Sequence, residues 1–549
     1  MTCPVNHPLI HTDPRLRAAY SEGAGIYRIV PAGVSIPSSL ADLREIISAA
    51  GAAGIGLIPR GAGSGIPGNA VGSGVLLDLR ERMPRRLEVD SASRAAITSS
   101  NITQAELTRA ALSHGLRLPP DPSSSGWATL GGMVSTNASG PHTVRYGPTR
   151  AWVEALELVT ADGEVGWLER AGKGAKIRAH SPPGALMRFQ RDVAPELLAA
   201  SDNIMARFPR TRKNTAGYAL DQWLASHDDL DLIIGAEGTL GLVTTILWKL
   251  DRIPAARSGL RICLQSLDHL EEAVRLLVAL EPSAVELLDR TFLDLLEQGG
   301  APAEAFAGVP AGSEAVLLVE FERGQARSAR GVAGDAVLAL KHLALDVTAA
   351  LTSEEEKRLW AMRQAASPIL AGLPAGRRSM QVVEDGCVPL PKLGEYVRAV
   401  RGSARDHDLT VVIFGHAGDG NVHVNVLPEL AQPDWPDRLE ALFREVSDAA
   451  IRLGGTVSGE HGDGRLRAPL LERLYGPAIM RLFRLVKTAF DPLGIFNPGV
   501  KLGGEGSSIR QLKVGDAAAP IPADIATALR EIERTGGYAQ SRVEIAEKR

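Results

Sequence analysis

Cysteines, long apolar runs and an excess of charge of one sign are all scarce or missing in this chain of 549 residues. Three cysteines are too few for a disulfide framework. They form no C-x-x-C pair, which excludes a zinc ribbon and an iron–sulfur cluster bound by such a motif. No run of about 18 apolar residues occurs, so no transmembrane helix is expected. The 60 basic and 64 acidic residues leave a net charge of −4, which gives no basic field for nucleic acid.

Length and the first residues add two expectations. A chain of this length predicts two or more domains with substantial buried cores. The amino terminus lacks the charged start and apolar run of a signal peptide, and together with the few cysteines this favours the reducing cytoplasm. Peripheral contact with a membrane stays open as an alternative.

The sequence pattern over residues 20–252 predicts an α+β region with many loops that contain glycine. Ser39 followed by Asp42 marks the start of one helix, which leads into a buried strand. Thr103 followed by Glu106 has the spacing of a capping box and marks the start of a second helix. Proline- and glycine-rich segments follow it.

The pattern changes after residue 252. Strands and helices alternate through 253–490, which predicts an antiparallel sheet covered on one face by helices and therefore a second domain. Beyond Gly503 the chain is rich in alanine, proline and glycine, with one weak helix signal at Asp524–Arg534. We expect a tail over 503–549 that is peripheral or bound to a partner.

Polar residues concentrate in two short glycine-rich segments, HAGDGNVHVNV (His416–Val426) and GEHGDG (Gly459–Gly464). An apolar stretch precedes the first segment, a glycine-rich turn follows, and apolar and polar residues then alternate, which predicts a β-hairpin. Successive side chains of a strand point to opposite faces. His423 and Asn425 therefore share the face opposite the valines of the second strand.

This hairpin predicts a metal site. His416 closes its first strand, His423 lies on its second, and Glu460 of the second glycine-rich segment supplies a carboxylate. A set of two histidines and one carboxylate suits zinc, manganese or ferrous iron. The alternative is structural hydrogen bonding alone; burying such groups unpaired costs about 1–3 kcal/mol each, which favours a shared ligand.

A glycine-rich loop follows the first buried strand. Gly63, Gly65 and Gly68 have G-x-G-x-x-G spacing, but Pro67 interrupts the loop and another strand follows, whereas a Rossmann loop opens a helix. Two interpretations stay open, a backbone nest that holds phosphate and a turn without a ligand.

Six motifs in this order carry a resemblance: PRGAGSGIPGNAVG, PPDPSSSGWATLGG, GAEGTLG, HAGDGNVH, GEHGDG and FDPLGIFNPG. Over roughly residues 20 to 502 the chain resembles the vanillyl-alcohol oxidase or p-cresol methylhydroxylase (PCMH) flavoproteins. Within them it is similar to the FAD-dependent D-lactate dehydrogenases (cytochrome type), D-2-hydroxyglutarate dehydrogenases and glycolate oxidase flavin subunits.

The resemblance implies an α+β protein with a PCMH-type FAD-binding domain at 20–252, a ferredoxin-like α+β cap that holds substrate and metal at 253–490, and a return to the flavin at 491–502. Residues 54–75 and 119–140 contain no His or Cys, so FAD is expected to be non-covalent. The implied pyrophosphate contacts are Arg60, Gly61, Gly63, Ser64, Gly65, Gly68 and Asn69. The implied flavin contacts are Pro120, Ser124, Thr129, Gly131, Gly132, Ser135, Asn137 and Asn497. The implied adenosine contacts are Glu237, Gly238 and Gly241.

For the reaction, the resemblance implies oxidation of a D-2-hydroxy acid such as D-lactate, glycolate or D-2-hydroxyglutarate to the 2-oxo acid. It implies a divalent metal, zinc or manganese, on His416, His423 and Glu460, the ligands that spacing also predicts. His461 is then the general base, Asn425 meets the hydroxyl, and Arg363 grips the carboxylate.

The sequence leaves several matters open. The electron acceptor is external, a quinone, a cytochrome, an electron-transfer flavoprotein or an iron–sulfur subunit, and a homodimer is one alternative for the oligomeric state. Arg377 and Arg378 would favour a second carboxylate on the substrate, or they form a solvated charge pair. Two rival functions are a flavin subunit active only in a complex and a related alkyl-transferring ether-lipid synthase.

Overall fold

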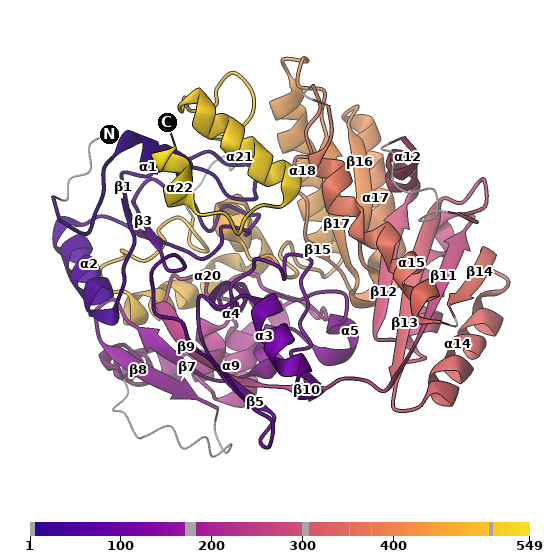
Figure 1. The fold of residues 1–549 in the computed structure, drawn as a ribbon, viewed down its shortest axis with the longest axis horizontal. Helices are drawn as coiled ribbons and strands as arrows, with labels where there is room; N and C mark the ends of the chain where they lie inside the picture. Colours follow the sequence, from indigo (N-terminus) through magenta and orange to yellow (C-terminus); the bar gives the residue numbers. More distant parts are fainter. Residues whose placement is uncertain are drawn as a thin grey trace.

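The computed structural model describes residues 6–170, 183–298, 307–350, 352–374, 376–503 and 509–548. Helices and sheets occur together as the predicted α+β class requires. Figure 1 shows two sheet-containing regions side by side, with the last residues of the chain above them.

The first region contains both capped helices that the sequence predicts. Ser39 accepts a hydrogen bond from the N–H of Asp42 and caps α2 (Leu40–Ala53), and Thr103 with Glu106 forms a capping box on α3 (Gln104–Leu112). A parallel sheet in the order β1-β3-β2 and an antiparallel sheet in the order β4-β5-β9-β7-β8 complete the region. Their bounds are β1 Gly33–Ser35, β2 Leu57–Arg60, β3 Val75–Asp78, β4 Leu87–Asp90, β5 Ala95–Ser99, β7 Val153–Val159, β8 Val165–Glu169 and β9 Leu242–Lys249.

The second region is one seven-stranded antiparallel sheet in the order β14-β11-β13-β12-β16-β17-β15. The strand bounds are β11 Ala256–Leu264, β12 Ala284–Asp289, β13 Ala315–Arg323, β14 Ala344–Ala350, β15 Gly386–Cys387, β16 Thr410–His416 and β17 Asn421–Leu427. The helices packed on it include α12 Arg290–Gln298, α14 Ala326–Leu340, α15 Ser353–Gln364 and α17 Leu393–Asp406. Helix α11 Leu270–Val278 packs against α14 and α17.

Helices cover both faces of this sheet, so the expectation of cover on one face is wrong. Leu260 and Ile262 of β11 pack with α14 in one apolar cluster, whereas Cys263 of the same strand packs with Phe292 of α12 and Met362 of α15 in another. The central strands β12 and β13 are buried almost throughout. Strands buried on both faces form continuous apolar runs, and the sequence shows such runs here.

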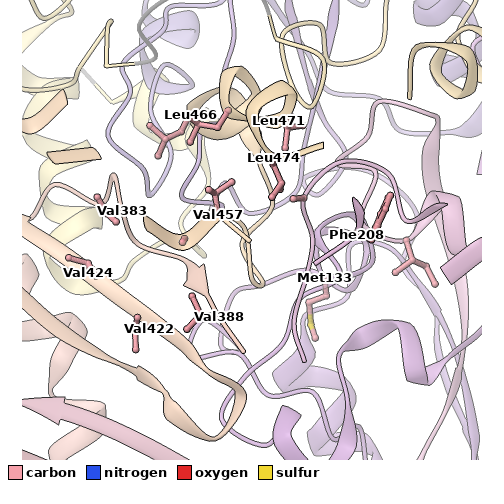
Figure 2. Close-up of a cluster of buried hydrophobic side chains, with 14 of the residues drawn as sticks. Met133, Phe208, Val383, Val388, Val422, Val424, Val457, Leu466, Leu471 and Leu474 are labelled. Carbon is pink, nitrogen blue, oxygen red and sulfur yellow. The ribbon is translucent and has the colours of Figure 1, made fainter. Parts of the chain in front are cut away.

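The predicted hairpin is confirmed as β16 and β17, with Phe414 opposite His423 and Val412 opposite Asn425. Figure 2 shows Val422 and Val424 among the buried apolar side chains, near Val383 and Val388. Burial of these valines on one face directs the polar residues of β17 to the other face, which carries α12 and α15.

Two long helices flank the GEHGDG segment, α18 (Trp435–Arg452) and α20 (Leu471–Phe490). Gly476, with φ of +78°, and Pro477 bend α20. The ring of Phe483 on α20 contacts Phe208 and Tyr218 edge to face, so this last helix of the predicted cap packs against the first region. No helix among the described residues is both long enough and apolar enough to cross a bilayer.

The chain then returns to the first region within 491–502, the residues for which the sequence predicts a return to the flavin. The N–H of Leu57 on β2 donates to the carbonyl of Ile495, and the N–H of Asn497 donates to the carbonyl of Leu57. The FNPG turn thus lies beside the strand that precedes the glycine-rich loop.

The last described residues are not a peripheral tail, which corrects the interpretation of 503–549. Helices α21 (Ala523–Thr535) and α22 (Arg542–Glu547) pack against α1 (Pro14–Ala19) through a shared apolar cluster. The weak helix signal at Asp524–Arg534 corresponds to α21. The apolar face of α21 is covered by residues from the opposite end of the sequence.

Candidate functional site

A cavity of about 1560 Å³ lies between the loops of the first region and the hairpin face of the second. Pockets for single small molecules commonly have volumes of about 300–1000 Å³. This cavity therefore has room for a large cofactor and a substrate together.

Backbone and small side chains form one wall of the cavity, which we call the glycine-loop wall. Most of the predicted cofactor residues line it: Arg60, Gly61, Gly63, Ser64, Gly65, Asn69, Ser124, Thr129, Gly131, Gly132, Ser135, Glu237, Gly238 and Gly241. A Cβ on Gly61 would lie 2.3 Å from Oγ1 of Thr129. Gly238 has φ of +68°, and its Cβ would lie 2.4 Å from Cγ of Pro59. Tightly packed glycine backbone is the wall that a phosphate nest requires, so these residues fit FAD.

Four predicted cofactor residues do not line the cavity: Gly68, Pro120, Asn137 and Asn497. Asn497 instead braces two loops, because its Nδ2 donates to the carbonyl oxygens of Asn69 at 2.9 Å and Glu237 at 2.8 Å. Gly68, with φ of +81°, allows the ring of Tyr27 to pack on the loop.

The carboxylate of Glu237 also differs from its predicted role. It accepts hydrogen bonds from the N–H groups of Asp463 at 2.7 Å and Gly464 at 3.0 Å, and it forms an ion pair with Lys501 at 3.1 Å. The Glu237 side chain therefore positions the GEHGDG segment from the side of the first region.

The three predicted metal ligands come together in the structure. Nε2 of His416 lies 3.0 Å and Nε2 of His423 lies 3.3 Å from the same oxygen, Oε1 of Glu460. All three side chains are buried. Nε2 of His461 lies 3.6 Å from that oxygen, so a third imidazole joins the group that spacing predicts. We call these four residues the imidazole cluster.

The other ring nitrogen of each histidine is already held. Nδ1 of His416 lies 2.6 Å from Oε1 of Glu286, Nδ1 of His423 lies 2.7 Å from the carbonyl oxygen of Glu384, and Nδ1 of His461 lies 2.7 Å from Oε2 of Glu384. Acceptors at Nδ1 turn Nε2 of each ring towards Glu460, which is the orientation of the donor atom in most histidine metal sites. The donor set therefore fits a divalent cation.

A buried lysine holds the other oxygen of Glu460. Lys213 is 1% exposed, and its Nζ lies 2.7 Å from Oε2 of Glu460 and 3.5 Å from Asp419. Burial raises the pKa of Glu460, but the charges of Lys213 and His416 outweigh it and hold that pKa well below its ordinary value. Glu460 is therefore ionised.

Asp385 fixes the backbone of the same segment. Its carboxylate accepts hydrogen bonds from the N–H of Glu460 at 3.0 Å and the N–H of His461 at 2.8 Å. The acidic pair Glu384-Asp385 interrupts an apolar stretch of the sequence, a signal that could have identified it. Glu286 interrupts the apolar stretch AVELLD in the same way, whereas Lys213 carries no such local signal; sequence reasoning missed both.

Arg363 and Asn425 line the cavity beside this cluster. Nε of Arg363 donates to Oε2 of Glu286 at 2.8 Å, and its guanidinium lies 4.9 Å from the ring centre of Phe414. Glu286 thus contacts both His416 and Arg363; burial raises its pKa, but these two cations outweigh burial and lower it to about 2. Oδ1 of Asn425 accepts from Ser379, and its Nδ2 is buried with no hydrogen-bond partner among the described residues.

Arg377 and Arg378, which the sequence suggested for a second substrate carboxylate, do not line the cavity. Arg377 forms an ion pair with Glu429 at 2.7 Å and Arg378 with Glu533 at 3.6 Å, and neither lines the cavity wall. The interpretation that they hold a second substrate carboxylate therefore gains no support from the geometry.

Comparison with known proteins assigns both regions to families. Residues 31–169 match the family model described as "FAD binding domain", and residues 253–500 match "FAD linked oxidases, C-terminal domain". The chain is 30% identical to "Glycolate oxidase subunit GlcD" of Bacillus subtilis, over 86% of this chain and 89% of that protein. It is 31% identical to "D-lactate dehydrogenase" of Archaeoglobus fulgidus, over 84% of this chain and 89% of that protein. With "D-2-hydroxyglutarate dehydrogenase" of Pantoea ananatis it shares 26% identity and spans 49% of that longer protein.

Solved structures agree on the fold. The chain superposes on p-cresol methylhydroxylase with substrate bound at a TM-score of 0.65 and 13% identity, covering 90% of this chain and 94% of that one. It superposes on alkyldihydroxyacetonephosphate synthase at a TM-score of 0.60 and 16% identity, covering 91% and 87%. At these identities the likeness concerns the fold alone, which is that of the PCMH-type flavoproteins. By its domains and its relatives, the chain belongs to the FAD-linked oxidase family.

Proposed function

We propose that the protein is an FAD- and divalent-metal-dependent dehydrogenase that oxidises a D-2-hydroxy acid to the 2-oxo acid. The observation that carries the proposal is the meeting of three imidazole nitrogens at Oε1 of Glu460, on a cavity whose opposite wall is the glycine-loop wall. The names of the relatives, a glycolate oxidase subunit and a D-lactate dehydrogenase, support the same class of substrate.

The metal would be held by His416, His423 and Glu460. A bound zinc or manganese ion supplies a Lewis acid that lowers the pKa of a coordinated hydroxyl group. Glu286 and the carbonyl of Glu384 keep the two rings oriented, and Lys213 holds the carboxylate.

The other residues would bind the acid and move its proton. Arg363, already fixed by Glu286, offers its guanidinium to the substrate carboxylate, and Nδ2 of Asn425 donates to the hydroxyl oxygen. His461 takes the hydroxyl proton at Nε2. Burial lowers the pKa of His461, but the charges of Glu384 and Asp385 outweigh burial and raise that pKa to about 9. The positive charge of the proposed metal ion would oppose this rise, which a general base requires.

FAD would bind non-covalently along the glycine-loop wall. When bound, it supplies the two-electron acceptor for the hydride that leaves Cα of the acid. The two electrons would then leave FAD for an external acceptor. The candidate acceptors are a quinone, a cytochrome, an electron-transfer flavoprotein and an iron–sulfur subunit.

Flavin bleaching tests this function. The purified protein, loaded with FAD and supplied with zinc or manganese, is mixed anaerobically with a panel of D- and L-2-hydroxy acids while the flavin absorbance is followed. We expect bleaching by at least one D-2-hydroxy acid and much slower bleaching by its L-enantiomer. Absence of bleaching by every acid of the panel would overturn the proposal.

A second candidate is a flavin subunit that is active only in a complex. The name of the Bacillus subtilis relative, a glycolate oxidase subunit, favours it. Gel filtration of the lone protein followed by a dye-reduction assay separates the two candidates, since a free-standing dehydrogenase reduces the dye without a partner. The same gel filtration tests for a homodimer. An alkyl-transferring synthase would give no net flavin reduction by any hydroxy acid.

A further inference from the structure

The C-terminal segment, residues 509–548, lies beyond the last residue matched by a family model, which is residue 500. Figure 1 shows α21 and α22 in yellow at the amino-terminal end of the chain, with α21 extending towards the second region. Ile525, Leu529 and Ile532 of α21 are buried together with Ala18 and Ala19 of α1. The segment is therefore docked through a core of its own.

The start of this segment is hydrogen-bonded to Ile26 and Arg28, and the strip that contains these residues contacts the glycine-rich loop. The N–H of Lys513 donates to the carbonyl of Ile26, and the N–H of Arg28 donates to the carbonyl of Gln511. The strip that contains Ile26 in turn packs on the glycine-rich loop, because the N–H of Ala24 donates to the carbonyl of Gly63.

The end of α21 and the residues after it form part of the cavity wall. The lining residues from this segment are Glu533, Arg534, Thr535, Gly536 and Tyr538. The ring of Tyr538 lies 6.0 Å from the ring of Trp127, a residue of the predicted flavin loop, and a Cβ on Gly536 would lie 3.0 Å from Trp127. Arg80 fixes the turn by donating to the carbonyl of Tyr538 at 3.0 Å.

The segment also reaches the second region. Arg530 donates to the carbonyl of Ala371 at 3.1 Å, and Glu533 forms ion pairs with Lys513 at 3.1 Å and with Arg378 at 3.6 Å. The segment thus contacts both sides of the cavity, at Trp127 through Gly536 and Tyr538, and at Ala371 through Arg530 of α21.

We propose that residues 509–548 form a C-terminal clasp that retains non-covalently bound FAD, with Tyr538 and Gly536 as wall residues against the cofactor. Release of FAD then requires the clasp to lift from Trp127 and from the glycine-rich loop. The proposal rests on FAD binding and not on the oxidation of a hydroxy acid, so failure of one leaves the other intact.

Hydrogen exchange on the full chain tests the clasp without any substitution. Amide exchange is compared for the flavin-depleted and the FAD-reloaded protein. We expect FAD to slow exchange of residues 530–538 at least about fivefold more than exchange of α14, which packs on the outer face of the second sheet. Equal slowing of both segments, or no FAD binding at all, would overturn the proposal.

A pair of substitutions tests the wall residue itself. The protein is diluted, and release of FAD is measured as the rise in flavin fluorescence over time. For Tyr538→Ala we expect release about tenfold faster than in the wild type, and for Tyr538→Phe, which keeps the ring, a rate within about twofold. A Tyr538→Ala rate within twofold of the wild type would contradict the clasp; if that variant fails to fold, the exchange experiment decides.

Discussion

The two walls of the cavity are built by different means. The glycine-loop wall consists of backbone and small side chains from three loops, each recognisable within a dozen residues of sequence. The opposite wall, around Glu460 and the imidazoles, is held in place by charged groups that pair with it: Lys213, Glu286 and Glu384 come from elements far apart in the chain. The first wall depends on local backbone conformation, whereas the second depends on long-range charge pairing.

This difference predicts that substitutions in one wall leave the function of the other intact, except at Glu237, whose carboxylate holds the GEHGDG segment. The largest effect is expected for Glu460→Gln, which removes the charge that the imidazoles and Lys213 face. We expect loss of metal and a fall in the rate of flavin reduction by about 1000-fold or more, roughly 4 kcal/mol, with FAD content unchanged. Glu429→Gln, which changes an exposed ion pair with Arg377, is the matched control. Normal turnover in Glu460→Gln would remove the metal from the mechanism.

The next largest effect is expected for Glu286→Gln. Glu286 orients His416 through one oxygen and Arg363 through the other, so the amide weakens both contacts. Loss of such a partner typically costs about 10–100-fold in metal affinity or activity. We expect a higher KM for the acid and weaker metal binding, measured by steady-state kinetics and metal titration, at unchanged FAD affinity. Unaltered KM and metal affinity would show that Glu286 orients neither group.

A smaller effect, on the other wall, is expected for Gly238→Ala. The φ of +68° disfavours a side chain, and the added Cβ would meet Pro59. We expect the Kd for FAD to rise about tenfold, as measured by fluorescence titration, while metal content stays at the wild-type level. A fall in metal content at saturating FAD would break the comparison, because the two walls would then not be independent.

The last expected effect is on stability and leaves both walls unchanged; it concerns a buried carboxylate outside the cavity. Burial raises the pKa of Asp289 to about 7, so its contribution to stability is present at low pH and is lost as the pH rises towards 7. Asp289→Asn keeps an acceptor for the N–H of Phe292 and removes this titration. We expect the stability of the variant relative to wild type to increase by about 2 kcal/mol between pH 5 and pH 8 in urea unfolding. A difference that does not change with pH would contradict the shifted pKa.

Sequence reasoning reached the features that local chemistry determines. Capping residues, the period of two in the hairpin and the glycine-rich loops predicted the elements around the cavity, and the hairpin spacing predicted that His416 and His423 meet. It missed Lys213 and Glu286, since a single charged residue on a loop or strand gives no sign of its partner across the fold. It also missed the docking of α21, whose partner α1 lies about 500 residues earlier.

The most direct test of the central claim is a titration of the metal-depleted, FAD-loaded protein with cobalt(II), followed by its visible absorption. We predict one ion per chain, bound by His416, His423 and Glu460, with an absorption spectrum that changes on addition of a D-2-hydroxy acid and is lost in Glu460→Gln. Equal cobalt binding by the wild type and Glu460→Gln, or no binding by either, would contradict it.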